Sequence, residues 1–133
     1  MKWLRNRSGD RSEDRGAAAV EFALVLPVLI LLVLGMMEFS RVYNAQISLT
    51  NAAREGARSM AIHHDPALAR SAASAAAPSV VPAVSSANVT VSPTTCAVGT
   101  AVTVTIHYNV ALFSGFFGAT LPLTGKGVMQ CGG

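Results

Sequence analysis

The sequence has few of the motifs that identify enzymes and nucleic-acid-binding proteins. It contains no glycine-rich phosphate loop, no nucleophile elbow and no paired acidic motif, so we predict a protein that is not an enzyme and uses no cofactor. The formal net charge is +3, but no basic face interleaved with aromatic residues occurs. This pattern argues against a nucleic-acid partner.

Charge is almost missing from residues 17–37, where Glu21 is the one charged side chain in a run of 21 residues. A helix of that length covers about 30 Å, the thickness of the hydrocarbon core of a bilayer. Residues 22–34 include eleven Leu, Ile, Val or Phe residues. They favour insertion by about 3–7 kcal/mol, which exceeds the roughly 2.5–3.5 kcal/mol cost of an acidic residue at a helix centre. We therefore predict a transmembrane helix over 17–37, bent at Pro27.

The flanks of the run predict its orientation, and they lack a signal-peptidase site. Residues 1–16 carry five basic and three acidic residues, whereas Arg41 is the first basic residue after the run. Basic residues before a span keep the N-terminus in the cytoplasm, so residues 38–133 are predicted to be extracytoplasmic. No A-x-A cleavage motif follows Leu34, so the helix is predicted to remain in the mature protein.

The start of the apolar run resembles a known processing site. A basic leader ends in Gly16, four small apolar residues follow, and Glu21-Phe22 then precede the hydrophobic helix. This pattern resembles the cleavage site of type IV prepilins, and most closely that of the Flp/Tad branch. Together with residues 39–41, residues 51–58 and the alternating strand in the tail, it is similar to the TadE-like pseudopilins.

The resemblance implies a minor pseudopilin that takes part in assembly of a Flp/Tad-type pilus and secretion machine in the cytoplasmic membrane. A prepilin peptidase would cleave between Gly16 and Ala17, and the new α-amino group would lie about one helical turn from Glu21. In a pilus, Glu21 would pair with the amine of a neighbouring subunit, and Phe22 belongs to the same assembly motif. The implied partners are the prepilin peptidase, other pilins and pseudopilins, the inner-membrane assembly platform and the lipid bilayer. The alternative is that Glu21 only extends to the membrane surface and that Gly16 merely precedes a helix.

Residues 38–133 predict a small α+β domain. A stripe of apolar residues at helical spacing continues the first helix outward and is expected to pack on strands: Phe39, Tyr43, Ile47, Thr50, Ala57 and Ala61. Asp65-Pro66 is a start signal for a second helix over 67–77. Strands are predicted at residues 88–91, 102–110 and 121–129.

The predicted fold class is therefore α+β, with a long N-terminal transmembrane helix that continues into a small pilin-like domain with a short antiparallel sheet. Its parts are a cytoplasmic leader at 1–16, the transmembrane helix at 17–37 and the extracytoplasmic domain at 38–133. The loop at 112–118 carries Phe113, Phe116 and Phe117, which are expected to be core or loop anchors, with a subunit contact as the alternative.

Cys96 and Cys131 are predicted to form a disulfide, with two free thiols as the alternative. A soluble domain of about 70 residues has a small core, and both cysteines lie outside the membrane in the predicted topology. A bridge would close 36 residues and contribute about 4 kcal/mol in the chain-entropy model.

The one cluster of side chains suited to metal binding or catalysis is His63, His64 and Asp65. Adjacent residues, however, do not make the i, i+4 pair of a helical zinc motif. His107 is expected on the polar face of a strand, so no metal site is predicted. Two other functions remain open. One is an uncleaved, single-pass, membrane-anchored extracytoplasmic binding protein, and the other is a small membrane enzyme that uses His63 and His64.

Overall fold

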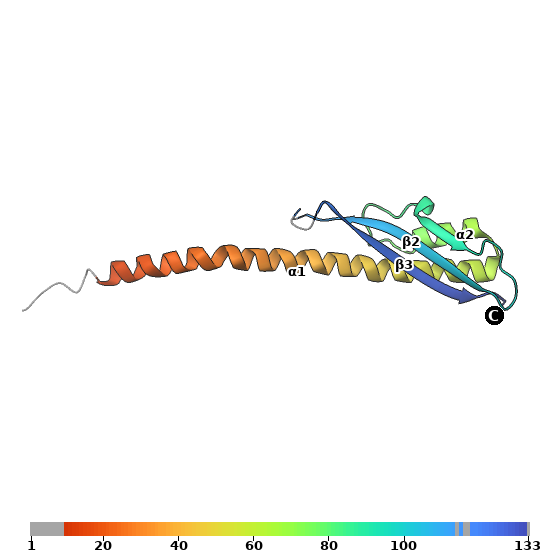
Figure 1. The fold of residues 1–133 in the computed structure, drawn as a ribbon, viewed down its shortest axis with the longest axis horizontal. Helices are drawn as coiled ribbons and strands as arrows, with labels where there is room; N and C mark the ends of the chain where they lie inside the picture. Colours follow the sequence, from red (N-terminus) through yellow and green to blue (C-terminus); the bar gives the residue numbers. More distant parts are fainter. Residues whose placement is uncertain (1–9, 114, 116–117, 133) are drawn as a thin grey trace, which may run out of the picture. The chain divides into compact units, whose positions relative to one another are not determined.

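The computed structural model describes residues 10–113, 115 and 118–132, with side chains described from residue 15 onward. Its elements are two α-helices, one short 3-10 helix and three strands: α1 (Asp10–His63), α2 (Pro66–Ala75), η1 (Ser86–Asn88), β1 (Val89–Ser92), β2 (Ala101–Ala111) and β3 (Thr120–Gln130) (Figure 1). A long apolar N-terminal helix is thus followed by a small antiparallel sheet, and the predicted α+β class is confirmed. The chain divides into two compact units, Met1–Met37 and Glu38–Gly133, which are described separately.

In the first unit, the described residues are all helical, and α1 begins at Asp10 within the predicted leader. Residues 1–9 of that leader lie outside the described part of the chain. Pro27 lies inside the helix, which continues past it. Among the described residues, α1 is the one helix long and apolar enough to cross a membrane, with a mean hydropathy of 2.7 over its most apolar 18 residues. The predicted transmembrane helix therefore has the required length and composition.

In the second unit, the three strands form an antiparallel sheet in the order β1-β2-β3. The central strand β2 alternates between buried and outward-facing residues, as its sequence pattern predicts. Its inward side chains are Val102, Val104, Ile106, Tyr108 and Val110. Each strand begins and ends within one residue of its predicted bounds. The strand β1 starts one residue late because η1 occupies Ser86–Asn88, with the Ser85 hydroxyl accepting a hydrogen bond from the Ala87 N–H at 3.3 Å.

The predicted buried stripe on the outer half of α1 is wrong at its large residues. Phe39, Tyr43 and Ile47 are 71%, 60% and 44% exposed. Ala57 of the predicted stripe is fully buried. The other buried residues of this half lie to one side of the stripe: Leu49, Ala52, Ala53, Gly56, Ser59 and Met60. The reason is the close approach of β3, because a Cβ built on Gly127 would lie 2.5 Å from the carbonyl oxygen of Ala53. Close packing on β3 therefore favours a short side chain at Ala53, while Leu49 and Met60 are fully buried on the same half of α1.

The second helix α2 begins where the sequence predicts. One carboxylate oxygen of Asp65, Oδ1, accepts hydrogen bonds from the N–H groups of Ala67 at 2.7 Å and Leu68 at 3.4 Å, so the predicted N-cap is confirmed. The helix α1 ends at His63, and His64 adopts a left-handed φ of 56° while its N–H donates to the Met60 carbonyl at 2.9 Å. This turn allows α2 to pack beside α1 in the second unit.

The predicted disulfide between Cys96 and Cys131 is present, with the two Cα atoms 5.5 Å apart. Backbone hydrogen bonds support it, since the Cys131 N–H donates to the Thr100 carbonyl at 2.8 Å and the Gly99 N–H donates to the Cys131 carbonyl at 3.1 Å. The bridge joins the loop before β2 to the residue directly after β3. It thereby closes the end of the sheet away from the loop between β2 and β3.

Candidate functional site

The predicted processing and assembly residues lie on one continuous stretch of α1. Gly16, Ala17, Glu21 and Phe22 are all helical and exposed, and a Cβ built on Gly16 would meet no other atom within 4 Å. Ala17 and Glu21 are separated by four residues, so they lie on the same face of the helix one turn apart. Among the side chains described from residue 15 onward, no ion pair involves Glu21. The arrangement leaves both the proposed scissile bond and the carboxylate open to other molecules.

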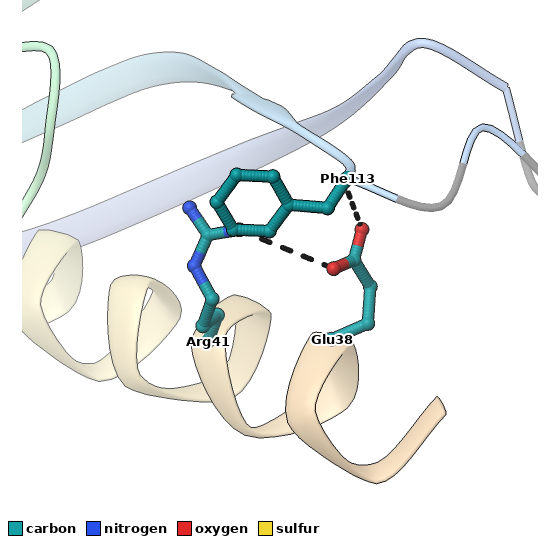
Figure 2. Close-up of polar contacts among 3 residues, drawn as sticks. All are labelled: Glu38, Arg41 and Phe113. Atoms are coloured by element: carbon teal, nitrogen blue, oxygen red, sulfur yellow. Dashed lines mark hydrogen bonds and ion pairs between the residues drawn. The ribbon is translucent and has the colours of Figure 1, made fainter. Parts of the chain in front are cut away.

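A second cluster lies at the start of the second unit, where charged residues return after the apolar run. Figure 2 shows Glu38 and Arg41 on α1 next to Phe113, which follows β2 in the chain. The Phe113 N–H donates a hydrogen bond of 2.6 Å to Oε1 of Glu38. The other carboxylate oxygen, Oε2, lies 4.0 Å from Nη1 of Arg41. The carboxylate thus holds the loop after β2 against α1 through a charge-assisted hydrogen bond.

The guanidinium of Arg41 also lies over the aromatic ring of Phe113, with Cζ 3.9 Å from the ring centroid. This is a cation–π arrangement, worth about 0.5–1 kcal/mol at an exposed site. The Glu38 side chain is only 12% exposed, whereas the Arg41 side chain is 44% exposed and Phe113 is 81% exposed. The Glu38 carboxylate is therefore bonded within the cluster, whereas the Arg41 guanidinium and the Phe113 ring remain exposed.

The sequence predicts Phe113 to be a core residue or a loop anchor. Its ring is not part of the core, because the residue is 81% exposed, but its backbone anchors the loop through the bond to Glu38. Phe116 and Phe117, predicted with it, lie outside the described residues. Our sequence reasoning missed the cluster. Its one local signal is the i, i+3 spacing of Glu38 and Arg41 directly after the apolar run, but Phe113 lies 75 residues further along the chain from Glu38.

Two further aromatic residues lie on α1 close to this cluster in sequence. The rings of Phe39 and Tyr43 stack with centroids 6.1 Å apart and an interplanar angle of 14°. Both rings are mostly exposed, as described above for the outward face of α1. The first two turns of the second unit therefore present several open aromatic rings.

A small cavity of about 210 Å³ lies between α1 and the segment before β1. Its polar lining residues are Arg41, Asn44, Ser79 and Tyr108. The Tyr108 hydroxyl donates a hydrogen bond of 2.7 Å to the Pro82 carbonyl, and burial raises the pKa of Tyr108. The tyrosine thus holds the segment before β1 against the sheet.

The two histidines contact different parts of the second unit. Nδ1 of His63 lies 3.1 Å from the Ser59 carbonyl, one turn back on α1, and Nδ1 of His64 lies 3.1 Å from the Cys96 carbonyl. Within the described part of the chain, no group of three or more His, Cys, Asp or Glu residues could hold a metal ion. His107 is exposed on β2, opposite Thr124 of β3. The contact of His63 lies within the end of α1, and the contact of His64 joins the turn between the helices to the loop that carries Cys96.

No curated protein and no solved structure matches the chain. One family model does match, over residues 16–58, and its description is TadE-like protein. The matched segment begins at Gly16, includes Glu21 and Phe22, and continues through the cluster residues Glu38 and Arg41. It contains the N-terminal motif on which the predicted resemblance depends. The predicted resemblance is therefore confirmed for residues 16–58, which are similar to TadE-like protein, while the rest of the chain lies outside the match.

Proposed function

We propose that this protein is a minor pseudopilin that takes part in assembly of a Flp/Tad-type pilus and secretion machine. The observation that carries the proposal is the position of the family match, which begins at Gly16, the last residue of the predicted leader. The same segment contains the apolar run of a helix with the length and composition of a membrane span. In this function, residues 17–37 hold the protein in the cytoplasmic membrane, with the N-terminus in the cytoplasm and residues 38–133 outside.

Processing creates the group that makes assembly specific. Cleavage after Gly16 leaves a mature chain of 117 residues, which is 133 minus 16, with a new α-amino group on Ala17. An acidic residue within a bilayer costs about 2.5–3.5 kcal/mol at the helix centre when it has no partner. The amine of a neighbouring subunit offsets this cost only when the two helices lie at one particular axial offset. The pair of Glu21 and the processed N-terminus thereby sets the register between subunits.

The second unit suits a structural role outside the membrane. It is closed by the disulfide at one end of its sheet and held to α1 by Glu38 near the other end. Such a domain stays folded while its helix moves from the bilayer into an assembly with other pilins and pseudopilins. The partners in this function are a prepilin peptidase, those other subunits and the inner-membrane assembly platform.

Cleavage is the decisive test. The full chain is expressed with and without a prepilin peptidase, and the N-terminus is determined by intact mass and N-terminal sequencing. We expect a mature chain that begins at Ala17 only when the peptidase is present, and we expect Gly16→Ala to abolish its formation. The matched control is Gly35→Ala, because Gly35 also lies on α1 with no other atom within 4 Å of a built Cβ. A chain that begins at Met1 under all conditions contradicts the proposal and favours the uncleaved, membrane-anchored binding protein.

The role of Glu21 is tested separately from cleavage. Glu21→Gln keeps the size of the side chain but removes its charge, so membrane insertion is retained while co-purification with the other subunits is lost. Glu55→Gln, which changes another exposed carboxylate on α1, serves as the control and leaves co-purification unchanged. Equal recovery of partners with both variants would count against the pairing role.

The enzyme alternative is tested with the double variant His63→Ala/His64→Ala. Assembly is expected to remain intact in this variant, and a lost activity would revive the enzyme alternative.

A further inference from the structure

We propose that Phe39, Arg41, Tyr43 and Phe113 form an interfacial collar that binds the lipid headgroup layer on the extracytoplasmic face of the membrane. The proposal rests on the proposed function, because it needs residues 17–37 to lie in a bilayer. It assigns a partner, a phospholipid surface, to a group of side chains that the core of the second unit leaves open.

The positions of these residues along α1 match the thickness of a headgroup layer. A helix rises about 1.5 Å per residue, so Phe39 and Tyr43 follow Met37 by about 3 and 9 Å. The hydrocarbon core is about 30 Å thick and the whole bilayer about 40–45 Å, which leaves about 5–8 Å of headgroup layer on each side. Phe39 therefore falls within this layer, and the backbone of Tyr43, at about 9 Å, lies just beyond its outer limit. Ile47, at about 15 Å, falls outside it.

The loop after β2 brings Phe113 to the same level. Its N–H is bonded to Glu38, the first residue after the apolar run, at 2.6 Å. A side chain that is remote in sequence is thus fixed beside the point where the chain would leave the hydrocarbon core. This contact explains why a mostly exposed phenylalanine is held in place by a mostly buried carboxylate.

The chemistry of the collar complements a phospholipid surface. Aromatic side chains are enriched where one side of a ring meets hydrocarbon and the other meets water, and phenylalanine serves this role on interfacial helices. The guanidinium of Arg41 lies over the ring of Phe113 and is 44% exposed as a side chain, so it can donate to phosphate oxygens. Glu38 is 12% exposed and is already bonded, so the collar presents a cation without an equally exposed anion. This charge balance favours anionic lipid phosphates over a second copy of the same basic surface.

The test uses fluorescence of single-tryptophan variants of the full chain in lipid vesicles. The sequence has one tryptophan, Trp3, which is first replaced by phenylalanine. Phe113→Trp then reports on the collar, and Val98→Trp is the matched control because the two native side chains are 81% and 83% exposed. Leu29→Trp reports on the span. Vesicles of phosphatidylcholine and phosphatidylglycerol are prepared without bromine, with bromine on the upper part of the acyl chains to quench tryptophan near the interface, and with bromine near the chain ends to quench Leu29→Trp in the middle of the span.

We expect brominated lipid to quench Phe113→Trp clearly more than Val98→Trp, and we expect Leu29→Trp to be quenched as well. Quenching of Leu29→Trp with no excess at Phe113→Trp overturns the collar while leaving the membrane span intact. Absence of quenching at Leu29→Trp instead contradicts the span and with it the proposed function. An emission shift of Phe113→Trp that follows the protein-to-lipid ratio and not the brominated lipid also overturns the collar, because it indicates coverage by a second copy.

Three additional variants separate the effect of lipid contact from an effect on the folding of the second unit. Arg41→Gln removes the cation, so the quenching of Phe113→Trp should lose its dependence on phosphatidylglycerol, and Arg41→Lys should restore part of it. Glu38→Gln weakens the charge-assisted bond to the loop and should lower the quenching. The urea midpoint of each variant, compared with that of the parent, shows whether the second unit remains folded. Unchanged quenching and lipid dependence in both Arg41→Gln and Glu38→Gln overturns the assignment of their roles.

Discussion

The contact between Gly56 of α1 and Ala73 of α2 allows the packing of the second unit to be tested quantitatively. A Cβ added at Gly56 would lie 2.8 Å from the Cβ of Ala73, 3.1 Å from the Ala69 carbonyl oxygen and 3.2 Å from Cγ1 of Val104. Ala69, Ala73 and Val104 are fully buried, so none can turn away into solvent. Gly56→Ala must therefore push α2 away from α1 or strain the core.

The expected magnitude combines two opposing effects. Overpacking a core by one methyl group costs about 1–3 kcal/mol, whereas exchanging glycine for alanine within a helix gains about 1 kcal/mol. Ala73→Gly loses about 1 kcal/mol of helix propensity and about 0.8 kcal/mol of buried methyl. The double variant Gly56→Ala/Ala73→Gly lacks the contact of 2.8 Å between the two Cβ atoms. Its loss of unfolding free energy should therefore be smaller than the sum of the two single losses by about 1 kcal/mol. The propensity terms occur in both the single and double variants and cancel in this difference.

The free energy of unfolding of each variant is measured by urea titration of the full chain in detergent micelles, with the disulfide intact. The control cycle pairs Ala73→Gly with Gly35→Ala, since no other atom lies within 4 Å of a Cβ on Gly35. That pair should be additive within about 0.3–0.5 kcal/mol. A Gly56–Ala73 coupling no larger than this scatter would refute the close packing of α1 on α2.

Three further predictions concern the stability of the second unit. Replacing Cys96 and Cys131 together by alanine should lower its free energy of unfolding by about 4 kcal/mol, and a urea midpoint equal to that of the parent would contradict the chain-entropy argument. Asp65→Ala removes the acceptor for two N–H groups of α2 and should cost about 1 kcal/mol, whereas Asp65→Asn should retain most of the stability. Burial raises the pKa of Tyr108 above its ordinary value of 10.0, so the folded state keeps a proton that the unfolded state loses. The free energy of unfolding should therefore fall as the pH rises above 10.0, and Tyr108→Phe should make that decline shallower in pH-dependent urea titrations.

Elements with strong local signals could be predicted from the sequence. The alternation along β2 required a strand with one buried face, and the Asp65-Pro66 pair marked the start of α2. The disulfide followed from the small size of the core and the shared compartment of the two cysteines. In each case the physical cause lies in a few neighbouring residues or in the composition of the whole domain, and both are visible before folding.

The buried face of α1 could not be predicted in the same way, because helical periodicity identifies apolar residues but not the neighbour they meet. Phe39, Tyr43 and Ile47 have the spacing of a core stripe but are exposed, whereas the backbone of α1 at Ala53 lies so close to β3 that a Cβ on Gly127 would clash with it. The choice of face depends on the backbone of β3, more than 70 residues away in sequence (127 minus 53 is 74). Only the folded arrangement shows which face of α1 is buried and that Phe39, Tyr43 and Ile47 lie outside it.

The same distinction separates the two parts of the candidate site. The proposed processing motif from Gly16 to Phe22 is a linear segment, so its residue order is enough to propose a cleavage site and an assembly carboxylate. Glu38 acquires its contact only when the loop after β2 returns to α1, which joins residues 75 positions apart. Its burial against an N–H and a guanidinium makes sense if the loop must stay beside the end of the apolar run, because a free loop would cost conformational entropy each time it engaged a surface. Preorganising Phe113 in this way should make lipid engagement tighter than the same ring would achieve on a flexible loop, and the loss of quenching expected for Glu38→Gln measures that advantage directly.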